Sequence, residues 1–309
     1  MNKKTVFSVL CFIMMILGST LYSNAIKPVG ASSIANDHTL VLYDAQTGTV
    51  PSAQLMSFTD FPFGEALPTF LEDVTVIDST RTGNDTYAGW ISSAASVSGF
   101  PILNRSVGFQ LKVTLQVEDE SHINNDRAGF SIIILSEDVK GIEIAFWENE
   151  IWVQGDSNTG GLFRHGEGIA FATTAGLVDY QITIVGDTYA LMANNENVLT
   201  GPVRDYSAFD GFPDPYETPN FIFIGDDTTS AQARVRLSYV SITGTEPVVP
   251  GSTSSSPPIP TPFPTTPIPS PTPSPKPFEL CPSGLSVMVL IGMLKFINGK
   301  PDTWFKNKK

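Results

Sequence analysis

Cysteine is nearly absent from this chain of 309 residues, which contains only Cys11 and Cys281. Both lie near the ends, so the region between them can form no internal disulfide and offers no cysteine for nucleophilic or zinc chemistry. The region that we expect to fold, residues 36–245, must therefore rely on a hydrophobic core, and its length is sufficient to bury one.

Positive charge is also scarce, with 18 Lys and Arg against 31 Asp and Glu and a net charge of −13. Such a surface disfavours binding to nucleic-acid phosphates or anionic lipids, so no nucleic-acid partner is expected. The acidic surface is compatible with Ca²⁺, with neutral sugars, or with charge that serves only solubility.

Helical periodicity is missing outside the two ends, and strand-like alternation takes its place. In residues 109–117, apolar side chains alternate with polar ones, and Asn, Asp and Gly turns separate the short runs that follow. We predict an all-β fold, a two-sheet antiparallel jelly-roll sandwich, with helices only in the terminal segments. The expected strands are residues 109–117, 130–135, 142–147, 151–154, 169–172, 180–185, 189–193, 221–224 and 233–242. Residues 199–219 are expected to form a long irregular connection.

Long apolar runs occur only near the ends. Lys3 and Lys4 precede an apolar run, and small residues end at Ala25, so residues 1–25 are predicted to be a cleaved signal peptide. An uncleaved membrane helix is the alternative.

Residues 246–277 are rich in Pro, Ser and Thr and predict an extended linker without a core. Residues 278–309 combine an apolar run with a basic end, which is typical of a membrane anchor or sorting segment. A buried or frayed tail is the alternative. We therefore expect an exported protein at the cell surface, anchored in the membrane through its C-terminal segment.

Several strand-like segments, among them Gly141-Ile-Glu-Ile-Ala-Phe-Trp and Ile151-Trp-Val-Gln, resemble concanavalin A-like lectin/glucanase domains. More narrowly, the chain is similar to bacterial surface proteins of the choice-of-anchor Y family. The resemblance covers residues 38–245. It implies an exported jelly roll joined to a C-terminal anchor, and it implies no known reaction.

One segment offers an enzymatic hypothesis. Residues 143–148 resemble the catalytic strand of laminarinase-type glucanases, in which two Glu residues act as nucleophile and general acid. Glu143 and Glu148 would fill these roles, but Ala145 occupies the position of the assisting Asp. A divergent glycoside hydrolase is therefore the alternative function, and no catalytic residue is predicted.

Binding is the preferred interpretation. Alternation places Glu143 and Trp147 on one face, with Trp152 and Gln154 nearby, and indole planes stack on sugar C–H groups while carboxylates and amides accept hydroxyl protons. These four residues, together with Arg164 and His165, are the predicted ligand-binding residues. The alternatives are that both indoles complete the packing and that Arg164 pairs with Glu167.

Asp226 and Asp227 follow a strand, and they are the candidate ligands of a structural calcium ion or, equally, ordinary turn residues. No cofactor is predicted otherwise. The sequence as a whole favours a non-catalytic, surface-tethered module that binds carbohydrate or another envelope component. A purely structural surface protein is the remaining alternative.

Overall fold

The computed structural model describes residues 37–61, 66–81, 87–211 and 213–247. The chain divides into two units, residues 1–252 and 253–309, and all described residues belong to the first. The predicted signal peptide, nearly all of the linker and the predicted anchor lie outside the described residues. Within the described part of the chain, no helix is both long enough and apolar enough to cross a bilayer.

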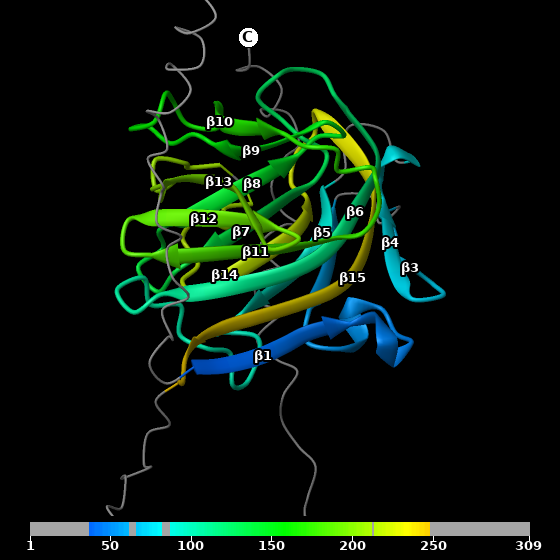
Figure 1. Ribbon diagram of the computed structural model, residues 1–309, viewed down its shortest axis with the longest axis horizontal. Coiled ribbons are helices and arrows are strands. Elements are labelled where there is room, and N and C mark those ends of the chain that lie inside the picture. Colours follow the sequence, from blue (N-terminus) through cyan, green and yellow to red (C-terminus); the bar gives the residue numbers. More distant parts are fainter. Residues whose placement is uncertain (1–36, 62–65, 82–86, 212, 248–309) are drawn as a thin grey trace, which may run out of the picture. The chain divides into compact units, whose positions relative to one another are not determined.

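Fifteen strands form two sheets, and every strand pairing among the described residues is antiparallel (Figure 1). Sheet A has the order β13-β12-β11-β6-β15-β4-β3, with β1 paired to β15. Its strands are β1 (Asp37–Asp44), β3 (Thr69–Leu71), β4 (Val74–Asp78), β6 (Phe109–His122), β11 (Val178–Val185), β12 (Thr188–Ala193), β13 (Glu196–Pro202) and β15 (Ala231–Thr245).

Sheet B has the order β10-β9-β8-β7-β14-β5-β2. Its strands are β2 (Ser57–Phe61), β5 (Tyr87–Ser93), β7 (Ser131–Leu135), β8 (Gly141–Phe146), β9 (Glu150–Gln154), β10 (His165–Ala170) and β14 (Phe221–Asp226). Three short 3-10 helices, η1 (Ala45–Thr47), η2 (Pro51–Ala53) and η3 (Ser79–Arg81), complete the described elements.

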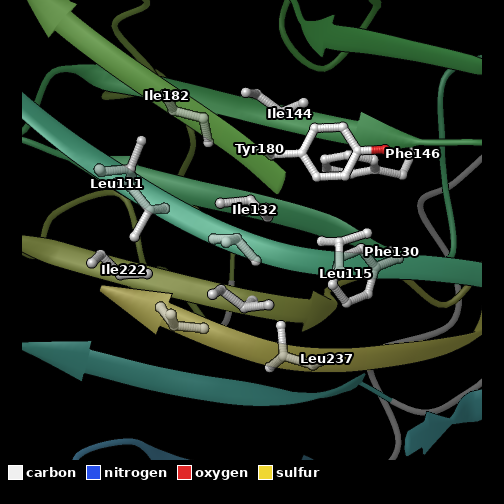
Figure 2. Packing of buried hydrophobic residues seen from close by; sticks show 14 of the residues in the cluster. Leu111, Leu115, Phe130, Ile132, Ile144, Phe146, Tyr180, Ile182, Ile222 and Leu237 are labelled. Atoms are coloured by element: carbon white, nitrogen blue, oxygen red, sulfur yellow. The ribbon is translucent and has the colours of Figure 1, made fainter. Parts of the chain in front are cut away.

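The two sheets enclose the main core. Strand alternation turns Leu111 and Leu115 of β6 inward, and Ile132 of β7 and Ile144 of β8 meet them from the other sheet (Figure 2). In β6, buried positions alternate with partly exposed ones over most of the strand, because only one face of sheet A is covered. The predicted all-β, two-sheet antiparallel sandwich is confirmed.

The middle strands of sheet B are covered on both faces. Every residue of β7, β8 and β14 is buried, and outward side chains of β7 and β14 enter a second apolar cluster formed by Ile133, Leu135, Tyr206, Tyr216, Phe221 and Phe223. Tyr206 and Tyr216 come from the long connection between β13 and β14. This covering decides which of the predicted site residues can reach solvent.

Candidate functional site

The candidate site lies on the face of sheet B that points away from the main core. Ile142, Ile144 and Phe146 belong to the main core, so the residues between them on β8 face the other way. Ala145 of β8 pairs with Trp152 of β9, which places the predicted residues of both strands on this outer face. The shared face predicted by alternation is therefore present.

Two indoles and two imidazoles meet on this face, and we call His122, Trp147, Trp152 and His165 the aromatic cluster. The His165 ring stacks on the Trp152 ring, with centroids 4.2 Å apart and planes inclined by 13°. The His122 ring stacks on Trp147 at 4.2 Å and 11°. The two stacks meet edge to face, because Trp147 lies 5.4 Å from Trp152 and 4.9 Å from His165. Arrangements of this kind are favourable for aromatic rings.

Each imidazole is also held by a carboxylate. His165 Nε2 lies 3.1 Å from Glu150 Oε1, and His165 Nδ1 lies 3.1 Å from the carbonyl oxygen of Asn125. His122 Nδ1 lies 3.0 Å from Glu120 Oε2. The cluster thus consists of two similar units, each a carboxylate, an imidazole and an indole in sequence.

One side of the aromatic cluster remains accessible to solvent. The side chains of His122 and His165 are 27% and 23% exposed, and Trp147 is only half-buried. The indole N–H of Trp147 donates to the carbonyl oxygen of Arg127 at 2.9 Å, which fixes the orientation of the ring. Arg164 lies at the margin with a 66% exposed side chain, and its Nη1 pairs with Asp126 at 2.6 Å.

A pair of carboxyl groups, the buried Glu143 and the half-buried Asp227, lies on the same face, and we call it the acid pair. Tyr216 Oη donates to Glu143 Oε2 at 2.5 Å, and Ser131 Oγ donates to Asp227 Oδ1 at 3.0 Å. Burial and the neighbouring charge of Asp227 raise the pKa of Glu143 well above its usual value. Burial also raises the pKa of Asp227, although the hydrogen bond from Ser131 and the charge of Arg127 oppose this. Two carboxyl groups in this arrangement hold a proton to a higher pH than exposed carboxyl groups do.

The connection that precedes β14 covers the acid pair. Tyr206 Oη accepts from the backbone N–H of Glu143 at 3.1 Å and donates to the carbonyl oxygen of Gln154 at 2.9 Å. Tyr206 and Tyr216 pack together with ring centroids 4.9 Å apart, and Phe163 packs on both. The irregular connection predicted for residues 199–219 is found from Val203 onward, whereas residues 199–202 belong to β13.

Three of the predicted binding residues are consequently buried. Glu143, Trp152 and Gln154 are 2%, 0% and 3% exposed, so they cannot line an open groove. The alternative prediction, that the indoles complete the packing of the sandwich, is correct for Trp152. Trp147, Arg164 and His165 keep access to solvent, and a binding role stays a prediction for them.

The ion pair predicted as an alternative for Arg164 needs correction. Arg164 does not pair with Glu167, because Arg164 pairs with Asp126 while Glu167 pairs with the buried Arg204. The two Glu residues of the hydrolase alternative have different surroundings: Glu143 is buried and accepts from Tyr216 Oη, whereas the exposed Glu148 accepts from the backbone N–H of Glu120 at 3.4 Å.

Asp226 and Asp227 make hydrogen bonds to different partners. Asp226 accepts from Ser79 Oγ at 2.6 Å and from the backbone N–H of Thr228 at 3.1 Å, whereas Asp227 belongs to the acid pair. Among the described residues, no group of three or more His, Cys, Asp or Glu side chains is arranged to hold a metal ion. Calcium binding stays a prediction, and it would require both carboxylates to exchange these partners.

Sequence reasoning missed several members of the site. His122, Glu120, Arg127 and Tyr216 all contact predicted residues or each other, but none has a sequence spacing that links it to them. The only signal was composition, because two of the three histidines and two of the four tryptophans of the chain gather here.

The amino-acid sequence matches no protein-family model and no curated protein. Similar solved structures include a carbohydrate esterase from the Shiga toxin-encoding bacteriophage phi24B, with 11% identity and a TM-score of 0.44 over 68% of this chain and 100% of that one. The Ca²⁺/Man-bound exoplasmic/lumenal domain of VIP36 is 10% identical, with a TM-score of 0.40 over 70% of this chain and 92% of that one. A family 7 alginate lyase A1-II′ is 11% identical, with a TM-score of 0.37 over 70% of this chain and 95% of that one. At these values the likeness carries no information on function.

Proposed function

We propose that the described domain is a non-catalytic carbohydrate-binding module of an exported protein that is tethered at the cell surface through its C-terminal segment. Its sequence resemblance to the choice-of-anchor proteins is part of the same proposal. The observation that carries the binding role is the solvent-accessible side of the aromatic cluster, where Trp147 is fixed in orientation and bordered by charged side chains.

The geometry suits a sugar ring. The half-buried Trp147 presents apolar surface to C–H groups, and its indole is held by the hydrogen bond to Arg127 and by the stack with His122. Exposed charged groups border it: Arg164 supplies guanidinium donors, and Glu148 supplies an acceptor. Because these groups are already positioned, little side-chain entropy is lost when a ligand binds.

The proposal of a non-catalytic role rests on the arrangement of the carboxyl groups. Glu148 accepts from the backbone N–H of Glu120 at 3.4 Å, whereas Glu143 accepts from Tyr216. Both members of the acid pair are engaged in hydrogen bonds, Glu143 with Tyr216 and Asp227 with Ser131. Export and tethering are supported by the signal-like and anchor-like sequences, which lie outside the described residues.

The test compares the unmodified chain with its variants, and it measures their binding to a glycan array and to gels containing laminarin, xylan or mannan. Trp147→Ala should lower affinity at least about tenfold, as expected for an aromatic anchor. Arg164→Gln should weaken binding to a smaller extent without touching the core. Phe61→Ala is the matched control, since Phe61 is a 44% exposed aromatic on β2, at the opposite edge of sheet B.

Unchanged affinity in Trp147→Ala would contradict the assignment of this face. Release of reducing sugar that disappears in Glu143→Gln would replace the binding role by hydrolysis. Absence of both binding and hydrolysis across the panel would leave a structural role for the sandwich.

A further inference from the structure

The two histidine–tryptophan stacks have hydrogen-bond partners that suit charged imidazoles. Both ring nitrogens of His165 face acceptors, namely the carboxylate of Glu150 and the carbonyl oxygen of Asn125, each at 3.1 Å. A neutral imidazole has one N–H and can donate to only one of them, whereas the imidazolium donates to both. In the neutral form one nitrogen lone pair would face an oxygen lone pair.

His122 has a comparable environment. Its Nδ1 contacts Glu120, whose side chain is 2% exposed and whose Oε1 also accepts from the backbone N–H of Gly129 at 3.1 Å. Burial raises the pKa of Glu120, and the hydrogen bonds from His122 and Gly129 oppose this effect. A buried carboxylate is stabilised by a cationic neighbour, so the charge on Glu120 and the proton on His122 support each other.

The stacked indoles complete both units. A cation above an indole face is attracted by the ring quadrupole, and each imidazole centroid lies 4.2 Å from that of its indole. Protonation therefore strengthens three contacts at once for His165: the bond to Glu150, the bond to Asn125 and the stack on Trp152. The other charged groups near the cluster are Glu148 beside Glu120, the Asp126–Arg164 pair at the backbone of His165, and Arg127 behind Trp147.

From this geometry we infer that the two carboxylate–imidazole–indole units act as a proton-dependent clamp on Trp147, which binds glycan best when His122 and His165 are charged. The inference rests on the proposed carbohydrate-binding function and adds its regulation. When the imidazoles lose their protons, His165 loses one of its two hydrogen bonds and His122 loses the charge assistance of its bond to Glu120. The stacks then loosen, and the indole of Trp147 is no longer held in place for a sugar ring.

The first experiment needs no glycan. Tryptophan fluorescence of the full-length chain is measured between about pH 5 and pH 8, the range in which imidazole side chains change charge. A stacked imidazolium quenches an indole more strongly than a neutral ring because it is the better electron acceptor. Fluorescence should rise with pH, at most about twofold, because two of the four tryptophans are stacked on histidines.

Variants assign this change to the stacks. His122→Gln and His165→Gln should each remove part of the rise, and the double variant should remove it. His38→Gln is the matched control, because His38 is the third histidine of the chain and contacts only the carbonyl oxygen of Gly99 among the hydrogen bonds seen. A rise that persists unchanged in the double variant would overturn the inference.

The second experiment measures affinity in gels containing laminarin, xylan or mannan at about pH 5.5 and pH 8. Affinity for a polysaccharide that binds should fall about tenfold at the higher pH, as expected for the loss of one charge-assisted hydrogen bond. In the double variant the affinity should be the same at both pH values. Equal affinity of the unmodified chain at both pH values would refute the clamp. A normal fluorescence change without binding to any glycan would instead refute the proposed function.

Discussion

Replacing Glu143 by Gln should reduce the dependence of stability on pH. The carboxyl group is 2% exposed, and Tyr216 and Asp227 surround it. Its pKa in the folded protein lies well above the ordinary value of 4.5, which applies to the unfolded chain. The folded state therefore keeps a proton that the unfolded state has released once the pH exceeds this ordinary value. Stability is fully present below that pH and is lost as the pH rises toward the pKa of the folded state.

The magnitude follows from linkage. One extra proton in the folded state lowers the free energy of unfolding by about 1.4 kcal/mol for each pH unit in this window. The side-chain amide introduced by Glu143→Gln would carry no titrating proton, its oxygen would still accept from Tyr216, and its nitrogen would still donate to Asp227. We therefore expect similar stability to the unmodified protein near pH 5 and higher stability near pH 8.

Urea denaturation at several pH values between about 5 and 8 gives the slope directly. Asp226 is also buried with a raised pKa, so some dependence on pH should remain in the variant. Glu137→Gln is the control, because Glu137 has an exposed side chain and should leave the slope unchanged. If the free energy of unfolding of Glu143→Gln changed with pH as steeply as that of the unmodified chain, the description of Glu143 as a buried, neutral carboxyl group would be wrong.

Two further predictions concern the surroundings of the site. Arg204→Met should destabilise the domain by about 2–4 kcal/mol in urea denaturation, because Glu167 and the carbonyl oxygens of Gln154 and Pro202 lose a fully buried partner. The exposed Arg164→Met should change stability by about 1 kcal/mol or less, and equal effects of the two would contradict this reasoning. Dialysis against EGTA should leave the melting temperature unchanged, because Asp226 and Asp227 already have hydrogen-bond partners. A clear decrease would instead identify a calcium site.

The parts of the fold that alternation encodes could be predicted from the sequence. Residues 109–117 and 233–242 alternate along most of their length, and both proved to be parts of long strands of sheet A. The five strands before residue 94 were not predicted. The segment 87–93, for example, consists largely of small and polar residues, yet its Trp90 is fully buried through its neighbours. Such strands acquire their structure from tertiary packing.

The sequence predicted which residues of the site share a face but not which of them are covered. Alternation placed Trp147, Trp152 and Glu143 on one face, but it carries no information about what lies above that face. The covering aromatic residues Tyr206 and Tyr216 occur in a connection without periodicity, and their contacts with Glu143 span 63 and 73 residues of sequence. His122 lies at the end of β6 in the other sheet, so its stack on Trp147 depends on how the two sheets meet.

The covering connection determines where a ligand can bind. Tyr206 and Tyr216 are anchored to Glu143 and Gln154 by hydrogen bonds, and they seal the middle of sheet B into a second apolar cluster. On the proposed function, the covered centre of sheet B leaves a polysaccharide the margin formed by the turn between β8 and β9 and by the end of β6. Trp147 is the indole that reaches this margin, whereas Trp152 supports it from beneath through His165. The proposed function therefore assigns the two tryptophans different roles, a ligand-contacting one to the half-buried Trp147 and a supporting one to the fully buried Trp152.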